Sequence, residues 1–154
     1  MSEHRTAQQI AEAARDHIRR HDRVARHLGI AIEAVGPGTA TLSMTVRDDM
    51  LNAFDICHGG IITTLADTAF ALACNSHGHL TVAAGLAVEF IAPARCAERL
   101  QATAQEVATA GRSGVYDVSI ENQDGRIVAV FRGKSARVSR PAVDAAGSSA
   151  SRQH

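Results

Sequence analysis

The feature that most constrains this chain is a long apolar segment that carries a single charge. Residues 52–76 begin with polar residues, pass through the glycine pair at 59–60 and then continue as a mostly apolar run. Apolar side chains occupy nearly every face of a helix of about four turns, which predicts a central, buried helix. Asp67 is the one charged residue in this run. A buried carboxylate is costly unless it is paired or has a chemical role, so Asp67 is the first candidate functional residue.

The composition limits what the rest of the chain can be. With 154 residues, 45% hydrophobic and 21% charged, the sequence fits one globular domain. The 16 basic and 16 acidic residues balance, and there is no Trp and only one Tyr. We therefore expect no binding to nucleic acid, because both electrostatic attraction and stacking platforms for bases are missing.

The cysteines and the N-terminus bear on the compartment. Cys57, Cys74 and Cys96 lack the paired spacing of a disulfide scaffold, which favours a reducing compartment. The first residues contain no apolar region typical of a signal peptide, and no apolar run reaches the ~20 residues of a membrane span. These features predict a cytoplasmic protein that does not bind a membrane.

The rest of the chain reads as one helix and six strands. Residues 3–27 lack Gly and Pro and carry apolar residues at helical spacing, which predicts a single N-terminal helix on the outside of the domain. Two strands follow around a Gly-Pro-Gly turn, and four come after the central helix without an intervening helix. The expected strands span residues 29–35, 38–46, 80–91, 99–108, 115–122 and 126–138.

This order of elements predicts an α+β fold. One long apolar helix lying across a meander of antiparallel strands would bury one face of the sheet. We therefore expect residues 29–138 to form a hotdog fold, in which an antiparallel sheet wraps around one long central helix. Residues 1–28 would add an extra N-terminal helix, and the small, polar residues 139–154 would form a disordered tail.

The start of the central helix offers a place where a carbonyl group can be polarised. His58-Gly59-Gly60 lies there, and the first turn of a helix presents unpaired N–H groups and the positive end of the dipole. Two glycines allow a ligand to approach this backbone, and His58 and Asn52 could add side-chain contacts. The alternative is that the glycines only make a tight turn and His58 caps the helix. The sequence leaves both interpretations open.

The spacing between Gly60 and Asp67 suggests a site shared by two chains. The seven intervening steps place them ~10 Å apart along one helix, too far to act easily on the same carbonyl. In a symmetric dimer with antiparallel helices, Gly60 of one chain can face Asp67 of the other. An Asp in that position could attack the carbonyl or deprotonate a water, and either step leads to hydrolysis of an acyl compound. The alternative is that Asp67 serves as a cap or ion pair in the core.

The combined motifs resemble the Asp-type hotdog thioesterases. The likeness extends over about residues 28–138 and is greatest to the phenylacetate-degradation (PaaI-type) branch, which hydrolyses hydroxyphenylacetyl-CoA and related aryl-acyl-CoA thioesters to the free acid and CoA. The motifs that carry it are Asn52, His58-Gly59-Gly60, Leu65-Ala66-Asp67-Thr68-Ala69, Ala71-Leu72-Ala73-Cys74-Asn75-Ser76, Gly114-Val115-Tyr116-Asp117 and Val130-Phe131-Arg132-Gly133-Lys134-Ser135.

The resemblance implies a role for each residue of the catalytic motif. Asp67 would be the nucleophile or general base, and the Gly60 N–H would polarise the thioester carbonyl. His58 and Asn52 would orient that end of the site. The resemblance also implies an acyl-CoA substrate, no cofactor, and a tetramer built from two dimers.

One position departs from the family pattern. The first strand after the central helix often carries a Ser or Thr that holds the attacking water, but this chain has Ala83-Ala84-Gly85 there. If water is held by a hydroxyl, we expect Thr64 or Thr68 to provide it.

Two groups of small and basic residues are candidates for binding the CoA portion. One group lies in an expected turn and the other on the last strand, although either could be solvated surface charge. The expected substrate contacts are Gly59, Thr68, Arg112, Ser113, Gly114, Arg132, Gly133, Lys134 and Ser135. The expected walls of the acyl pocket are Leu51, Phe54, Phe70 and Phe90.

Two other functions remain compatible with the sequence. A hotdog enoyl-CoA hydratase or dehydratase would need a His acting at the β-carbon, and none follows Asp67 at helical spacing before His77. A non-catalytic acyl-CoA sensor would leave Asp67 without a purpose. No metal is expected, because His58, His77 and His79 lack the partners that complete the usual ligand sets.

Overall fold

The computed structural model describes residues 4–141 as helices, strands and connecting loops. The elements are α1 (Ala7–His21), α2 (Arg23–His27), β1 (Ala31–Gly36), β2 (Thr39–Thr45), the 3₁₀ turn η1 (Asp48–Met50), α3 (Gly59–Asn75), β3 (His79–Phe90), β4 (Arg99–Ala110), β5 (Ser113–Glu121) and β6 (Ile127–Pro141).

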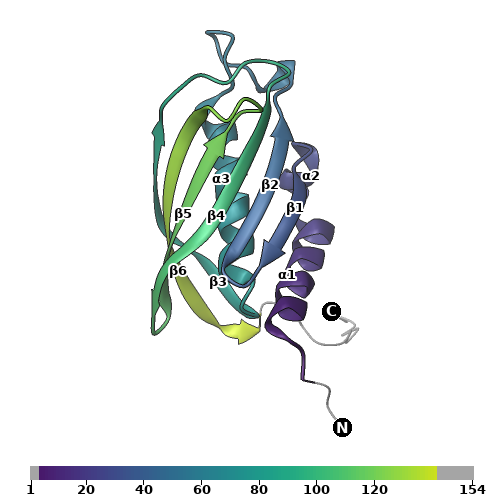
Figure 1. Ribbon diagram of the computed structural model, residues 1–154, viewed down its shortest axis with the longest axis vertical. Helices are drawn as coiled ribbons and strands as arrows, with labels where there is room; N and C mark the ends of the chain where they lie inside the picture. Colours follow the sequence, from purple (N-terminus) through teal and green to yellow (C-terminus); the bar gives the residue numbers. More distant parts are fainter. Residues whose placement is uncertain (1–3, 142–154) are drawn as a thin grey trace, which may run out of the picture.

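The strands form one six-stranded sheet in the order β1-β2-β4-β5-β6-β3. Every neighbouring pair is antiparallel, and β3 lies at one edge although it follows α3 directly in the chain. Helix α3 packs against all six strands, while α1 and α2 lie beside β1 (Figure 1). This arrangement confirms the predicted hotdog fold with an added N-terminal helical segment.

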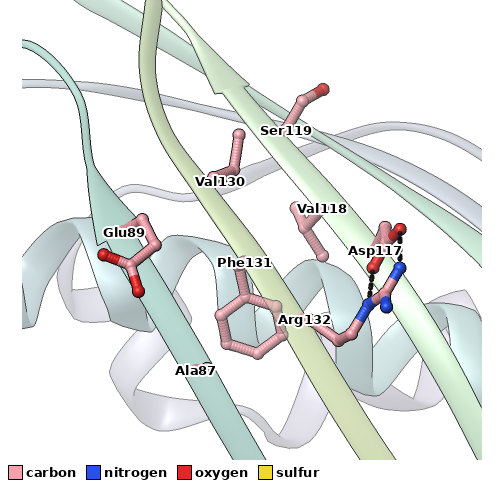
Figure 2. A pocket seen from close by; sticks show the side chains of 8 residues that line it. All are labelled: Ala87, Glu89, Asp117, Val118, Ser119, Val130, Phe131 and Arg132. Carbon is pink, nitrogen blue, oxygen red and sulfur yellow. Dashed lines mark hydrogen bonds and ion pairs between the residues drawn. The ribbon is translucent and has the colours of Figure 1, made fainter.

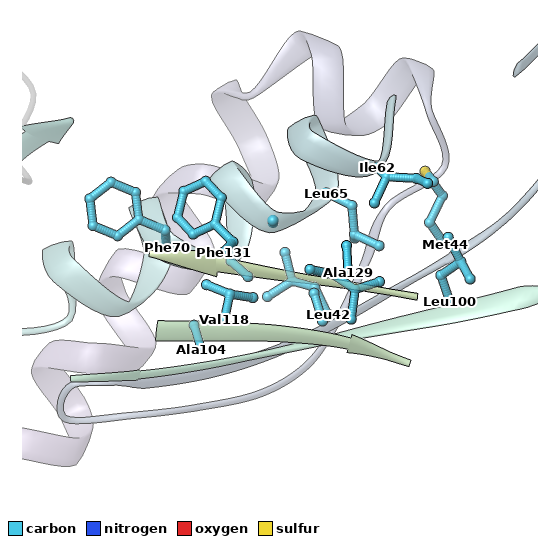
Figure 3. Packing of buried hydrophobic residues seen from close by; sticks show 14 of the residues in the cluster. Leu42, Met44, Ile62, Leu65, Phe70, Leu100, Ala104, Val118, Ala129 and Phe131 are labelled. Atoms are coloured by element: carbon cyan, nitrogen blue, oxygen red, sulfur yellow. The ribbon is translucent and has the colours of Figure 1, made fainter. Parts of the chain in front are cut away.

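The core lies between α3 and the face of the sheet that it covers. Leu65 and Leu72 of the helix and Leu42 and Leu100 of the sheet are fully buried. Figure 3 shows several of these side chains interleaved between the helix and the strands. Along β2, Ala40, Leu42 and Met44 face the core with the period of two expected for a strand, and Ser43 on the opposite face is buried as well.

The N-terminal helical segment differs from the prediction, because it is broken in two at Asp22. The Asp22 carboxylate accepts the Ala25 N–H at 2.9 Å and so caps α2, while its own N–H closes α1 on the Ile18 carbonyl at 2.9 Å. An Asp side chain that binds a backbone N–H three residues on competes with a continuous helix. The prediction of one helix over 3–27 was therefore wrong in its continuity. Helix α1 starts at Ala7, where Thr6 and Gln9 form a capping box.

The last strand also extends further than expected. Strand β6 continues to Pro141, which lies opposite His79 at the start of β3. The disordered tail was predicted to begin at residue 139. Strand β6 instead continues beyond that residue, because the start of β3 still pairs with it. Residues 142–154, the remainder of that predicted tail, lie outside the described residues. None of the described helices has the length and apolarity that crossing a membrane requires.

Candidate active site

Helix α3 begins with a histidine cap. The His58 Nδ1 accepts the Gly60 N–H at 3.1 Å, as in the capping alternative considered for this motif. Because Nδ1 is the acceptor, a neutral His58 ring carries its proton on Nε2. The His58 side chain is exposed, so this Nε2–H is free to donate to a molecule bound at the helix start.

Asn52 organises the loop that leads into α3. Its Oδ1 accepts the Phe54 N–H at 2.9 Å, and its backbone N–H donates to the Ile56 carbonyl at 2.8 Å. The same loop is tied to the rest of the domain by the Cys57 N–H, which donates to the Ala94 carbonyl at 2.8 Å. In this structure Asn52 therefore shapes the approach to the helix start, and its predicted contact with substrate stays a prediction.

Asp67 lies on a partly open strip of α3. Gly60, Thr64, Asp67 and Ala71 follow one another at helical spacing and are all less buried than the residues that face the sheet. Within residues 4–138, the Asp67 carboxylate has no hydrogen bond and no ion pair. The alternative of a cap or core ion pair thus finds no partner in the described part of the chain.

The surroundings of Asp67 favour its protonated form. Burial raises the pKa of this carboxyl, and the negative charge of Asp22 raises it further. Asp22 was not among the predicted site residues, because it lies within the single helix that was predicted over residues 3–27. An Asp before a short helical run is an N-cap signal, and recognising it would have placed a helix break here.

The hydroxyls suggested as water-holding groups are engaged by the helix itself. Thr64 donates to the Gly60 carbonyl at 2.9 Å, and Thr68 donates to the Thr64 carbonyl at 2.8 Å. Thr68 is also buried. Ala83, Ala84 and Gly85 lie on the exposed edge strand β3 and carry no side-chain donor.

The residues predicted to contact CoA lie in separate parts of the structure. Arg112, Ser113, Gly114 and Ser135 border one small polar hollow near the C-terminal end of α3, which His77 and Arg137 also line. Strand pairing explains this, because Gly114 lies opposite Ser135 in the β5–β6 ladder. The hollow is narrow, about 30 Å³.

Arg132 lies elsewhere, on the sheet face turned away from α3. Its Nε and Nη2 donate to the two carboxylate oxygens of Asp117 at 2.6 and 2.7 Å, and Figure 2 shows this pair on neighbouring strands. The Arg132 guanidinium lowers the pKa of Asp117. They border a shallow hollow of about 350 Å³ that also includes Glu89 of β3. Lys134 is exposed on β6, so the structure does not bring the predicted cations together.

Gly133 faces the core. A Cβ built there would lie 2.9 Å from ring atoms of Phe70, which leaves no open approach for a ligand on that side. Phe70 is itself buried, with its ring centroid 5.7 Å from that of Phe131. Its ring packs inside the core of the single chain, and its predicted place in the wall of an acyl pocket lined from the dimer partner stays a prediction.

An apolar hollow of about 470 Å³ lies beside the start of α3. Of the four predicted pocket walls, only Phe90 borders it; Leu51 packs against the core, and Phe54 is 81% exposed. Asn52 and Gly59 were predicted as site residues in other roles, Ile62 belongs to α3, and the other walls were not predicted because they come from loops without a period. The hollow is bordered by Asn52, Ile56, Cys57, Gly59, Ile62, Phe90, Ile91, Ala92, Pro93 and Ala94.

The described side chains give no indication of a metal site. Among residues 4–138, no group of three or more His, Cys, Asp or Glu side chains is arranged to hold an ion. The chemical groups near α3 are therefore the helix start, His58 and the unpaired Asp67.

Comparison with known proteins agrees with this reading of the fold. The Thioesterase superfamily model matches residues 54–129. The acyl-coenzyme A thioesterase PaaI of Escherichia coli is 46% identical over 118 residues, which cover 77% of this chain and 84% of that protein. A putative esterase of Archaeoglobus fulgidus is 35% identical over 130 residues, 84% of each chain.

A solved structure shows the same architecture over nearly its whole length. The E. coli PaaI protein of the phenylacetic acid degradation operon superimposes with a TM-score of 0.86 at 40% identity, covering 88% of this chain and 99% of that one. With this fold, this motif set and these relatives, the chain belongs to the thioesterase superfamily as a PaaI-type hotdog thioester hydrolase.

Proposed function

We propose that this protein hydrolyses aryl-acyl-CoA thioesters, such as phenylacetyl-CoA or hydroxyphenylacetyl-CoA, to the free acid and CoA. The observation that carries the proposal is Asp67, a half-buried carboxylate without a partner in the described residues, on the same open strip of α3 as Gly60. The likeness to a protein named acyl-coenzyme A thioesterase supports the CoA ester as substrate.

In this proposal Asp67 attacks the thioester carbonyl or removes a proton from the attacking water. Either role needs the carboxylate form of Asp67. Because the pKa of this carboxyl is raised, its carboxylate is a stronger base than that of an exposed Asp. The helix start opposite it stabilises the negative charge that develops on the carbonyl oxygen. Each well-placed donor lowers the barrier by about 3 kcal/mol.

The Gly60 N–H and the His58 ring exchange partners in this scheme. In the structure without substrate, the Gly60 N–H is occupied by His58 Nδ1. A thioester oxygen that takes over this N–H displaces the ring, whose Nε2–H is then placed to donate as well. The His58 ring thus keeps the Gly60 N–H hydrogen-bonded until a substrate oxygen takes the place of Nδ1.

A second copy of the chain completes the proposed site. Gly60 and Asp67 lie ~10 Å apart along the open strip of α3. An antiparallel partner helix brings Gly60 of one chain next to Asp67 of the other. Edge strand β3 is long, and Val82 and Leu86 on it are 46% and 47% exposed. An exposed apolar edge of this kind favours pairing with a second chain. The proposed assembly is a dimer with two such sites, two dimers forming a tetramer in the cytoplasm.

The remaining proposed contacts concern CoA. The polar hollow bordered by Arg112, Ser113, Gly114 and Ser135 is one candidate for contacts with the polar groups of CoA, because an Arg and two hydroxyl side chains border it. Arg132 is already paired with Asp117, and it would contribute only by exchanging that partner.

The first experiment measures thiol release from phenylacetyl-, hydroxyphenylacetyl-, benzoyl-, crotonyl- and long-chain acyl-CoA with a disulfide reagent. We expect rapid release from the aryl esters, and a fall of 100-fold or more, on the order of the loss of a general base, in Asp67→Asn. Turnover of Asp67→Asn within a few fold of the wild type would refute the role of Asp67. Hydration of crotonyl-CoA without thiol release would indicate a lyase, and binding of CoA esters without turnover would indicate a sensor.

A mixing experiment tests the shared site. Gly60→Pro removes the N–H at the second position of α3, where no intrahelical hydrogen bond depends on it, and Asp67→Asn removes the carboxylate. Each variant alone should be inactive. After the two are unfolded and refolded together, half of the dimers are hybrids with one intact site of two, so about a quarter of the wild-type activity should return. No recovery in verified hybrids would show that both groups act from one chain.

A further inference from the structure

Phe90 is held against the backbone of the first residue of α3. An ideal Cβ at Gly59 would lie 2.9 Å from Cζ of Phe90, 3.2 Å from Cε2 and 3.3 Å from Cε1. The ring edge therefore occupies the space that any larger residue at position 59 would need. Phe90 is nevertheless 52% exposed, so the ring is fixed on one side and open on the other.

The open side of the ring faces the apolar hollow beside the helix start. The hollow of about 470 Å³ is bordered by aliphatic side chains, including Ile56, Ile62 and Ile91, and no charged residue lines it. Asn52 and Gly59 border it as well, so it adjoins the helix start where a thioester carbonyl is proposed to bind. Apolar hollows of this size with few polar groups are typical small-molecule sites.

We propose that Phe90 determines the acyl specificity of this enzyme, its ring acting as a platform on which the aromatic ring of an aryl-acyl group packs. The inference rests on the thioesterase function proposed above and names the substrate class of that site. Aromatic rings attract one another in offset or edge-to-face contact beyond the effect of buried area, which an aliphatic chain cannot reproduce. The glycine at position 59 is then required by the Phe90 ring, and not by the approach of substrate to the backbone.

Two esters with eight acyl carbons test this platform. The kcat and KM for phenylacetyl-CoA and octanoyl-CoA are measured for the wild type, Phe90→Leu and Phe90→Ala. We expect Phe90→Leu to lower kcat/KM for phenylacetyl-CoA by about tenfold, mainly through KM, and to leave octanoyl-CoA within about twofold. Val107→Ala, on an exposed part of β4 that does not border the hollow, controls for loss of an exposed apolar side chain and should change neither value.

A double-mutant cycle separates the two explanations for Gly59. Gly59→Ala should lower kcat/KM for phenylacetyl-CoA, because the added methyl group displaces the ring of Phe90. In the Phe90→Ala background the same substitution should have almost no further effect, since nothing then occupies that space. Equal effects of Gly59→Ala in both backgrounds would show that the glycine serves the substrate directly and would overturn the platform.

The remaining outcomes are also decisive. If Phe90→Leu lowers kcat/KM for both esters by the same factor, Phe90 only supports the helix start, and the inference is wrong while the thioesterase function stands. If the wild type releases no thiol from any ester, the proposed function fails first and the inference falls with it. Thermal unfolding of each variant identifies any that do not fold, and Phe90→Leu, which keeps an apolar side chain of similar size, decides the question if Phe90→Ala is unstable.

Discussion

Replacing Gly133 by alanine inserts a methyl group between two buried aromatic rings. An ideal Cβ there lies 2.9 Å from Cε2 and from Cζ of Phe70 and 3.0 Å from Cε1 of Phe131. These rings are 1% and 3% exposed, so neither can turn away into solvent. The backbone at Gly133 needs no special conformation, because its φ is not positive. Gly133→Ala therefore tests packing alone.

The size of the effect follows from two opposing contributions. Overpacking a well-filled core by one methyl group costs about 1–3 kcal/mol. Alanine recovers about 0.5–1 kcal/mol relative to glycine in a strand, because it loses less backbone entropy on folding. We expect a net loss of about 1–2 kcal/mol, which corresponds to a fall in Tm of roughly 2–8 °C for a chain of this length.

Gly85→Ala is a matched control on the same pair of strands. Gly85 lies opposite Lys134, one step along the β3–β6 ladder from Gly133, and a Cβ there meets nothing within 4 Å. This variant should be as stable as the wild type or slightly more stable. Urea unfolding at a fixed protein concentration gives both free energies, and their difference isolates the overpacking.

Equal stability of the two variants would refute the packing argument. Adding Phe70→Leu to Gly133→Ala should relieve the clash, so the cost of the pair should be less than the sum of the single costs. If Gly133→Ala instead keeps full stability and raises KM for the CoA ester, then Gly133 contacts the ligand, as its place among the predicted CoA contacts implied.

Two further predictions concern titrating groups. The folded-state pKa of Asp67 is raised above its ordinary value of 3.8, so the wild type should lose stability as pH rises from that value through the folded pKa. Asp67→Asn should remove this loss and be the more stable protein at pH 7, which urea midpoints at pH 4 and pH 7 would check; an unchanged pH dependence would contradict it. Burial raises the pKa of Cys57 to about 11 and of Cys74 to about 12, whereas Cys96 is exposed. A thiol reagent at pH 8 should therefore label one cysteine per chain rapidly and the other two only on unfolding, and rapid labelling of all three would contradict the structure.

The sequence predicted the fold because its elements have strong local signals. The strand predicted over residues 38–46 is β2, in which apolar and polar residues alternate, and the apolar Ala40, Leu42 and Met44 are buried. The Asp124-Gly125 pair, a hairpin-turn signal, lies between the strands predicted over 115–122 and 126–138, and Gly125 has the positive φ that this position requires. Hydrophobic periodicity and turn-forming residues depend on only a few neighbouring positions, so they predict local structure without knowledge of the tertiary structure.

The ends of helices and the interaction partners of charged side chains were harder to predict from the sequence. The helix break depends on whether the Asp22 carboxylate turns back to the Ala25 N–H or faces solvent, and spacing does not decide between these. Arg132 was interpreted as a CoA contact because it is basic and adjoins a glycine. The cross-strand pairing of β5 and β6 places it opposite Asp117, which occupies its guanidinium.

By itself the sequence determined that a buried helix carries one carboxylate and begins with a histidine and two glycines, and that strands surround it. Only the tertiary structure decided what each small residue is for: Gly133 makes room for Phe70, and Gly59 makes room for Phe90. It also left Asp67 without a partner among the described residues. The physical reason is that secondary structure follows from interactions between near neighbours, whereas the space around a glycine or a carboxylate is filled by residues that the fold brings from distant parts of the chain.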